Sequence, residues 1–326
     1  MSHRPRVLVL TGGPTDSSPP LDVVAPLADI VLADSPEALE RELPSADILF
    51  IWNYAFADLD PLIPAAERLR WIHAAHVGVD PLMSPVLLAS DLVVTNSRGT
   101  FDTAIAEYVT GLLLAFTKDL YGTWRLQQQR QWSHRITGML RGQRIATVGT
   151  GSIGRCIAAM LKALGAEITL VGRRSAHDPE FGTIVSSQEL AAVAGRVDTL
   201  ILAPPLTEHT RGMVDHSVLA ALGPAGYLIN IGRGPLVVEA DLLHALSSGQ
   251  IAGAALDVFD HEPLPTDSPL WTASNVVVSP HMSGDFKGFE TALVEVFVHN
   301  LRQWIHEKPL DNVVDLSLGY VPRTTV

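Results

Sequence analysis

Three polar residues of different chemical type each follow an apolar segment in the second half of the chain. Arg233 comes after YLINIG, Glu262 after AGAALDV, and His281 after NVVVSP. A guanidinium group is a planar fork that matches a carboxylate, and an imidazole beside a carboxylate can give a proton to a reacting oxygen and take it back. These groups could therefore bind an acidic substrate and move a proton. Each residue alone also fits a structural role, as a solvated turn arginine, a loop carboxylate or a histidine satisfied by local hydrogen bonds.

A glycine-rich turn, G-x-G-x-x-G, lies upstream of these residues and directly after the apolar segment RIATV. In a dinucleotide site, Gly149 would allow the tight turn, Gly151 would let the backbone approach the pyrophosphate, and Gly154 would let helix and strand pack closely. The following residues predict an amphipathic helix over Ser152–Leu164, with Gly165 as its C-cap. The pattern predicts a dinucleotide site, and an ordinary glycine-rich turn between a strand and a helix is the structural alternative.

Two arginines follow the next apolar segment, in the stretch LVGRRSA at residues 170–176. An acidic residue at this place typically holds a ribose hydroxyl of NAD. Arg173 and Arg174 would instead pair with the 2′-phosphate of NADP, with help from Ser175, and Gly172 would leave room for the adenosine ribose. We therefore predict NADP(H) as the cofactor, with NAD(H) as the alternative. A solvated basic turn on an acidic protein is the structural reading of the same residues.

Strand-like and helix-like segments alternate along the chain, which predicts parallel sheets covered by helices. In the first hundred residues the expected strands are Arg6–Leu10, Ala46–Trp52, Trp71–Ala74 and Leu92–Thr95. A helix capped by Ser35 lies between the first two, and helical spacing extends from about Phe101 to Gln131. After Gln143 the expected strands are RIATVG, EITLVG, DTLILA, YLINIG, AGAALDV and NVVVSP. The tail, Thr291–His306, returns to helix, and the segment after Gln143 amounts to a complete doubly wound domain.

The composition limits the class of protein. A chain of 326 residues predicts two domains, and a net charge of -12 argues against nucleic acid or an anionic membrane surface as a partner. The single cysteine, Cys156, excludes an intramolecular disulfide and fits a reducing compartment. The first apolar run is shorter than the core of a signal peptide, and no run approaches the roughly 18 residues that span a bilayer, so we expect a cytoplasmic protein. His73 and His76 have no further ligand pattern around them, so no metal site is expected.

Taken in order, the motifs resemble those of the D-isomer-specific 2-hydroxyacid dehydrogenase family, particularly its glyoxylate/hydroxypyruvate reductases. The strings that carry the resemblance are HVGVDPL, NSRGTFDTAIAEYVTGLLL, VGTGSIG, LAPPLTEHTRGMVD, LINIGRGPLVVEADLLHAL, AALDVFDHEPLP and SPHMSG. They cover most of residues 45–312. The resemblance implies an α/β fold, with a doubly wound (Rossmann) cofactor domain at 99–286 and a smaller flavodoxin-like substrate domain. The substrate domain would be discontinuous, made of residues 1–98 and 287–326, with the active site in the cleft.

The resemblance also assigns roles to the candidate residues. Arg233 would bind the substrate carboxylate and carbonyl, His281 would protonate the developing alkoxide as hydride arrives from the nicotinamide, and Glu262 would orient His281. The backbone of Val77 and Gly78 would also hold the substrate carboxylate. The implied cofactor positions are Gly149, Thr150, Gly151, Ser152, Ile153, Gly154, Gly172, Arg173, Arg174, Ser175, Ala203, Pro204, Pro205, Thr210, Ile231, Gly232, Ser283, Gly284, and Asp257, which would meet the nicotinamide carboxamide.

The resemblance further implies a homodimer, because the helix that begins near Phe101 usually lies at the dimer interface in this family. Two other functions stay open. One is a dinucleotide-sensing regulator without catalytic activity, although the positions of Arg233, Glu262 and His281 all carry the catalytic residue types. The other is a dehydrogenase of a different acid, with the same site and another substrate.

Overall fold

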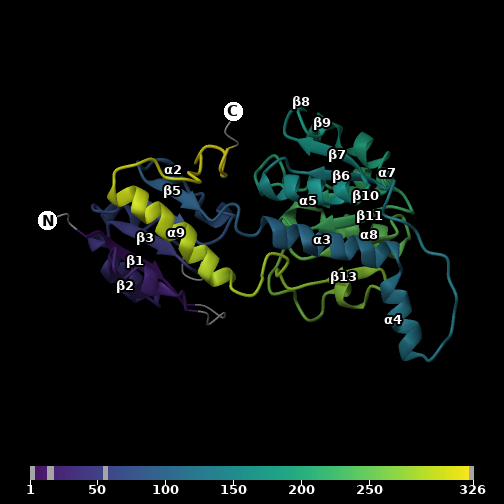
Figure 1. Cartoon of the computed structure of the whole chain (residues 1–326), viewed down its shortest axis with the longest axis horizontal. Coiled ribbons are helices and arrows are strands. Elements are labelled where there is room, and N and C mark those ends of the chain that lie inside the picture. The colour runs from purple at the N-terminus through teal and green to yellow at the C-terminus, as the bar shows by residue number, and fades with distance from the viewer. Residues whose placement is uncertain (1–3, 13–17, 54–57, 323–326) are drawn as a thin grey trace. The chain divides into compact units, whose positions relative to one another are not determined.

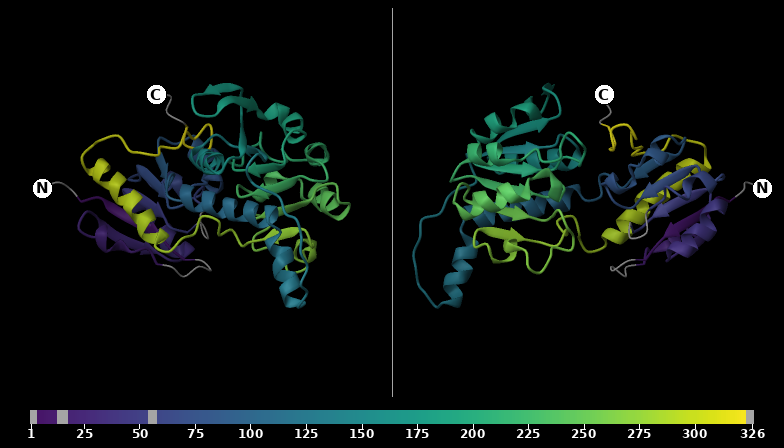
Figure 2. Two further views of the ribbon diagram at one scale, coloured as in Figure 1. Left: turned by 45° about the vertical axis from the view of Figure 1, so that its right-hand side comes forward. Right: turned by 180° about the vertical axis from the view of Figure 1, so that it is seen from behind.

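The computed structural model describes residues 4–12, 18–53 and 58–322. The chain forms two compact units (Figure 1), one made of Met1–Thr100 and Phe286–Val326 and the other of Phe101–Asp285. The second unit is therefore inserted between the two stretches that build the first, as the colouring of Figure 2 shows. Within the described ranges, no helix has the length and apolar content that crossing a membrane requires.

The first unit is built on a five-stranded parallel sheet in the order β2-β1-β3-β4-β5. Its strands are β1 (Arg6–Leu10), β2 (Asp29–Ala33), β3 (Ile48–Ile51), β4 (Trp71–Ala74) and β5 (Val93–Asn96). Its α-helices are α1 (Pro36–Glu42), α2 (Pro85–Leu88) and α9 (Phe289–Ile305). Ser35 caps α1 as predicted, since its side chain accepts a hydrogen bond from the Ala38 backbone N–H. The strand order is that of flavodoxin-like folds, which confirms the fold class predicted for this unit.

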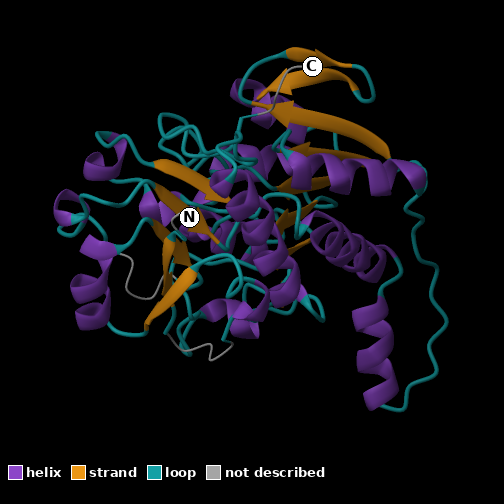
Figure 3. Ribbon diagram, turned by 60° about the vertical axis from the view of Figure 1, so that its left-hand side comes forward, coloured by secondary structure: helices purple, strands orange, loops and turns teal. Residues whose placement is uncertain are grey.

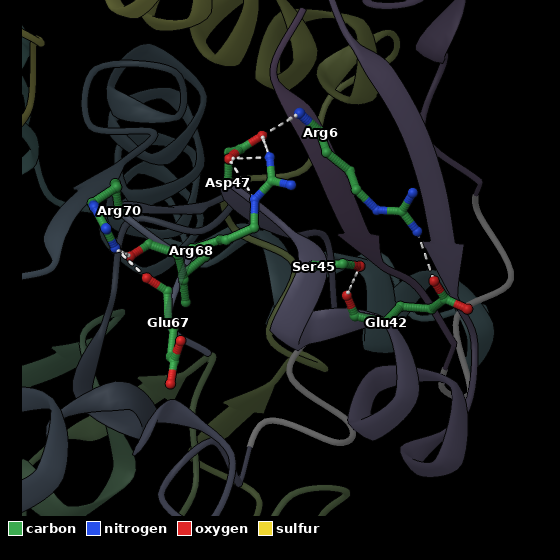
Figure 4. Close-up of polar contacts among 8 residues, drawn as sticks. Arg6, Glu42, Ser45, Asp47, Glu67, Arg68 and Arg70 are labelled. Carbon is green, nitrogen blue, oxygen red and sulfur yellow. Dashed lines mark hydrogen bonds and ion pairs between the residues drawn. The ribbon is translucent and has the colours of Figure 1, made fainter. Parts of the chain in front are cut away.

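Arginine–carboxylate contacts hold the amino-terminal edge of this sheet together (Figure 4). Asp47 precedes β3, and its carboxylate accepts hydrogen bonds from the Arg6 backbone N–H (2.8 Å) and from Arg68 Nη2 (2.9 Å). The Arg6 side chain in turn pairs with Glu42 at 2.7 Å. Ligands of open α/β sheets bind at the opposite, carboxyl-terminal edge. These contacts therefore support the sheet away from the edge where a site is expected.

A buried histidine on β4 belongs to a hydrogen-bonded chain inside the first unit. His73 is fully buried, with Nδ1 2.7 Å from Thr95 Oγ1 and Nε2 3.4 Å from Ser97 Oγ. Thr95 Oγ1 accepts a hydrogen bond from Trp71 Nε1 (2.8 Å), so its own proton is available for His73 Nδ1. Burial lowers the pKa of His73 to about 3, so the ring stays neutral in the folded protein.

We expect this histidine to make the first unit sensitive to acid. Its folded pKa is about 3, whereas an unfolded histidine has a pKa of about 6.5. Between these values only the unfolded chain takes up the proton, so the free energy of unfolding falls by up to about 1.4 kcal/mol per pH unit as the pH drops; above this window the effect is absent. Urea unfolding of His73→Gln should therefore show a shallower pH dependence than wild type, whereas the exposed-site variant His306→Gln should keep the wild-type slope. Equal slopes for wild type and His73→Gln would contradict this assignment.

The second unit contains an eight-stranded sheet in the order β13-β12-β11-β10-β6-β7-β9-β8, and Figure 1 labels most of these strands. The strands are β6 (Arg144–Val148), β7 (Glu167–Gly172), β8 (Ala176–Asp178), β9 (Gly182–Ser186), β10 (Thr199–Leu202), β11 (Tyr227–Asn230), β12 (Gly253–Leu256) and β13 (Val276–Val278). The helices are α3 (Asp102–Thr117), α4 (Leu120–Gln128), α5 (Ser152–Ala163), α6 (Leu190–Ala194), α7 (His216–Leu222) and α8 (Glu239–Ser247). All strand pairs are parallel except β8 with β9, and the strand order reverses at β6. This is the predicted doubly wound sheet, with its ligand crevice expected between the carboxyl ends of β6 and β10.

The prediction of one continuous helical segment from about Phe101 to Gln131 is wrong in one respect. The structure breaks it into α3 and α4 at Asp119, whose backbone is left-handed (φ 46°). The Asp119 side chain caps α4 by accepting a hydrogen bond from the Gly122 N–H and also pairs with Arg135 at 2.8 Å. In the sequence, the helical periodicity of α3 concealed this N-cap. Beyond the break at Asp119, α4 extends away from the sheet (Figure 3).

Candidate active site

The glycine-rich turn between β6 and α5 can be built only with glycine at two of its positions. Gly149 has a left-handed backbone (φ 107°), and a Cβ there would lie 2.8 Å from the carbonyl group of Ala203, after β10. A Cβ on Gly154 would lie 2.0 Å from the carbonyl oxygen of Gly149. The turn, the first turn of α5 and the end of β10 are therefore packed backbone against backbone, as a dinucleotide-binding turn requires.

The N-terminus of α5 fits the pyrophosphate of a dinucleotide. Gly151 is its N-cap, and within the described chain no side chain caps this helix. A Cβ on Gly151 would meet no atom within 4 Å, so the backbone here borders open space. Unsatisfied N–H groups and the helix dipole favour an anion at such a place. The Ser152 hydroxyl donates to Asp102 Oδ1 (3.2 Å), so this residue would meet a phosphate through its backbone N–H.

The basic stretch lies beside this turn. β6 and β7 are paired, and the Gly149 N–H donates to the carbonyl oxygen of Val171 at 2.8 Å. Arg173, Arg174 and Ser175 follow directly, and all three are exposed. In the part of the chain that the structure describes, neither arginine side chain has an ion pair or hydrogen bond. Both guanidinium groups are therefore available to an anion bound at the adjoining turn.

Gly172, the last residue of β7, has a packing role that the sequence analysis did not consider. A Cβ there would lie 2.9 Å from Ile184 Cγ2 on β9 and 3.2 Å from Thr150 Cγ2. The predicted space for an adenosine ribose is thus bordered closely by these two side chains. A larger residue here would have to displace the Ile184 and Thr150 side chains.

The loops after β10 and β11 join the same edge of the sheet. The Ala203 N–H donates to Val148 O (2.9 Å), and the Ile231 N–H donates to Leu202 O (3.2 Å). A Cβ on Gly232 would lie 3.1 Å from Pro204 O. In the first of these loops, Thr210 Oγ1 accepts from Thr207 N and donates to Pro205 O, both at 2.8 Å, so it holds the loop in shape.

The three polar residues of the catalytic hypothesis follow β11, β12 and β13, which are neighbours in the sheet. His281 Nδ1 lies 2.7 Å from Glu262 Oε2, and the second carboxylate oxygen of Glu262 accepts the Phe259 N–H at 2.9 Å. Arg233 Nη1 donates to Gly232 O (2.8 Å), and its charge acts on the Glu262 carboxyl. The fold therefore brings together three side chains that lie 19 to 48 positions apart in the chain.

Electrostatics fix the orientation of the histidine proton. Burial alone would raise the pKa of Glu262, but the hydrogen bonds from His281 and the Phe259 N–H, with the charges of His281 and Arg233, outweigh burial and lower the pKa. An ionised carboxylate only accepts hydrogen bonds, so His281 Nδ1 must carry the proton that faces Glu262. This arrangement leaves Nε2 as the ring atom for proton exchange with a substrate.

Asn230 supports this site and was not identified by the sequence analysis. It is the last residue of β11 and is 1% exposed. Its Oδ1 accepts the Gly232 N–H (3.1 Å), and its Nδ2 donates to Arg233 O (2.9 Å). The turn that carries Arg233 is thus held by one buried amide side chain. The sequence did offer one sign of this role, an asparagine at the end of an otherwise apolar strand.

Two predicted substrate residues, Val77 and Gly78, lie in the first unit, after β4. The carbonyl oxygen of Val77 accepts a hydrogen bond from Asn96 Nδ2 at 2.6 Å. Their contact with a substrate stays a prediction. Among the described residues, no group of three or more histidine, cysteine, aspartate or glutamate side chains is placed to hold a metal ion.

Comparison with known proteins shows which family this chain resembles. Residues 110–283 match the family model described as D-isomer specific 2-hydroxyacid dehydrogenase, NAD binding domain. A glyoxylate reductase of Thermofilum pendens is 31% identical, over 91% of each chain, and a glyoxylate/hydroxypyruvate reductase A of Arabidopsis thaliana is 32% identical, over 76% of this chain and 79% of the relative. The crystal structure of an NADPH-dependent glyoxylate/hydroxypyruvate reductase from Sinorhizobium meliloti, in complex with NADP and sulfate, is 28% identical with a TM-score of 0.84, covering 97% of this chain and all of that chain.

Proposed function

Because the chain belongs to the D-isomer-specific 2-hydroxyacid dehydrogenase family, we propose that it reduces small 2-ketoacids of the glyoxylate and hydroxypyruvate type to D-2-hydroxy acids with NADP(H). The observation that carries the proposal is the contact of His281 with Glu262, under the charge of Arg233, at the carboxyl edge of a sheet that also carries the glycine-rich turn. The relatives and the NADP-bound neighbour support the substrate class and the cofactor.

In the proposed reaction each residue has one task. A bound nicotinamide supplies the hydride for reduction and accepts it in the reverse direction. Arg233 binds the substrate carboxylate and polarises the carbonyl group. His281 gives the Nε2 proton to the carbonyl oxygen as it becomes an alkoxide, and takes a proton back in the oxidation. Glu262 keeps the Nδ1 proton in place and stabilises the charged ring.

The test is to mix the protein with NADPH or NADH and a panel of 2-ketoacids and to follow the loss of absorbance of the reduced cofactor. We expect oxidation of NADPH with glyoxylate or hydroxypyruvate. A protein that binds NADPH but oxidises it with no ketoacid would instead be a dinucleotide-sensing regulator. Turnover only with pyruvate or bulkier ketoacids would assign the site to another acid. A cytoplasmic location belongs to the same proposal, while the contact of Asp257 with the nicotinamide carboxamide stays a prediction from the family resemblance.

We also propose that the protein is a homodimer held by the arm, defined as residues 120–139. Large apolar side chains on this arm face solvent: Trp124 is 64% exposed, Trp132 102%, Ile136 95% and Met139 63%. Exposed apolar groups gathered in this way mark an interaction surface, and tryptophan and methionine are enriched at interfaces. A second copy of the chain is the partner proposed, in line with the family resemblance.

Trp132→Lys should convert the dimer to a monomer, because a charged side chain would enter the apolar contact. The control is Leu164→Lys, at another exposed apolar position of the same unit, where Leu164 is 46% exposed. Light scattering coupled to size-exclusion chromatography measures the mass of each protein. A monomeric wild type, or a Trp132→Lys protein that stays dimeric, would contradict the role of the arm.

A further inference from the structure

Several hydrogen bonds join Asp257 to the segment that carries His281. Asp257 directly follows β12 and is 1% exposed. Its Oδ1 accepts hydrogen bonds from Ser279 Oγ (2.6 Å) and the Met282 N–H (3.0 Å), and its Oδ2 accepts the Ser283 N–H (2.9 Å). The His281 N–H donates to the Asp257 carbonyl oxygen at 2.8 Å. One residue therefore holds the Ser279 side chain before His281 and the backbone at and after His281.

This network surrounds an uncommon backbone conformation. His281 has a φ of 52°, in the left-handed region that non-glycine residues seldom occupy, although histidine does so more often than most. Such a conformation persists where the surrounding contacts over-determine it. The direction of the imidazole depends on this angle, and so does the 2.7 Å contact of Nδ1 with Glu262.

The network reaches one step further, to α3. Tyr108 of α3 interacts with Ser279, which lowers the pKa of its hydroxyl, and with the charge of Asp257. Burial raises the pKa of Tyr108, and the negative charge of Asp257 raises it further, so the hydroxyl keeps its proton. Ser279 is itself buried, at 8% exposure. A buried carboxylate with only backbone and hydroxyl donors is tolerated when those hydrogen bonds are made.

We propose that Asp257 is a positioning residue, supported by Ser279 and Tyr108, which holds His281 in its left-handed conformation and so keeps the imidazole aligned with Glu262. This proposal rests on the proposed function, because it takes His281 as the group that transfers the proton. It differs from a contact of Asp257 with the nicotinamide carboxamide, which would act on cofactor binding. The burial of Asp257 and the use of both carboxylate oxygens within the protein favour the positioning role.

In Asp257→Asn an amide NH₂ group faces backbone N–H groups that need an acceptor. The segment that carries His281 should therefore lose hydrogen bonds to residue 257 and become less constrained. We expect kcat for 2-ketoacid reduction to fall by about 100-fold, since a displacement of about 1 Å costs that much, while NADPH binding, followed by its fluorescence, is retained. Tyr108→Phe and Ser279→Ala each remove one support and should lower kcat by a smaller factor. Thr110→Val, which removes a hydroxyl of α3 whose hydrogen bond among the described residues goes to Ala106 O, should be unchanged. If none of the three variants lowers kcat, the proposal is overturned.

A double-mutant cycle separates positioning from cofactor contact. In a His281→Asn background, Asp257→Asn should lower kcat little further, because Asp257 acts through His281. An undiminished loss in that background, or a loss confined to NADPH affinity, would refute the proposal in favour of the carboxamide contact.

Hydrogen exchange provides a readout that does not depend on turnover. The amides of Met282 and Ser283 should exchange faster in Asp257→Asn than in wild type, and the amides of β6 should not. If the protein reduces no ketoacid, the proposed function fails while this measurement still reports on the network. Unchanged exchange at Met282 and Ser283 would overturn the inference by itself.

Discussion

Replacing His281 is expected to lower kcat for 2-ketoacid reduction by about 10³-fold, while the dissociation constant of NADPH stays close to that of wild type. Nδ1 of this ring is engaged by Glu262 at 2.7 Å, so Nε2 is the atom proposed to exchange the proton. Without the imidazole, the developing alkoxide would have to take its proton from water. The proposed cofactor site at the glycine-rich turn belongs to another part of the sheet, so this substitution should leave it unaltered.

The choice of substitution follows from the backbone. His281→Ala removes the imidazole but leaves a residue that disfavours the left-handed region, whereas asparagine tolerates it. His281→Asn and His281→Ala should therefore lose turnover alike if proton transfer is the role of the side chain. His216→Ala, at an exposed position of α7, should keep the wild-type rate. Near-normal turnover in His281→Asn, with NADPH still bound, would reject the assignment of the acid.

The parts of the site that were predictable from the sequence are those whose causes are local. Gly149 and Gly154 are required because added Cβ atoms would strike backbone within the turn or at the adjoining strand end. Arg233, Glu262 and His281 each follow an apolar strand, and parallel strands bring their carboxyl ends to one edge. Knowing the residue type and the strand that precedes it was enough to place them.

The parts that were missed depend on contacts between distant segments. The three hydrogen bonds of Asp257 come from residues 22 to 26 positions away, and the register of β12 with β13 decides whether they form. The strands β8 and β9 form a short antiparallel hairpin at the edge of the sheet, and β8 is only three residues long, so the sequence pattern did not reveal them. Asp178 at the end of β8 is buried against Arg155 of α5, while the exposed neighbours of Asp178 give no apolar alternation. β2 is an edge strand with only Ala33 buried, so its hydrophobic pattern is weak.

The second large effect concerns the cofactor. The variant Arg173→Asp/Arg174→Ala is expected to weaken NADPH binding by about 100-fold, which corresponds to about 2.7 kcal/mol. Hydrogen bonds to charged groups contribute about 1.5–3 kcal/mol each. Because the two guanidinium groups are exposed, solvent screening places the pair just below the lower end of the sum of two such bonds. An aspartate beside the turn would repel a 2′-phosphate and could accept a ribose hydroxyl of NADH instead. NADH binding should therefore be kept or improved, and the cofactor preference should invert.

Three measurements decide whether these arginines recognise the 2′-phosphate or only supply positive charge. Fluorescence titrations with NADPH and NADH give the two dissociation constants for each protein. Arg196→Asp changes the charge at another exposed position of the same unit, so it should leave the ratio of the two constants as in wild type. Added salt should weaken NADPH binding to wild type more than to the double variant, because the ion pairs that salt screens are absent from the variant.

A wild type that uses NADH as efficiently as NADPH, or a double variant that keeps its NADPH affinity, would mean that the 2′-phosphate is recognised elsewhere or not at all. The basic stretch after β7 would then be an ordinary solvated turn.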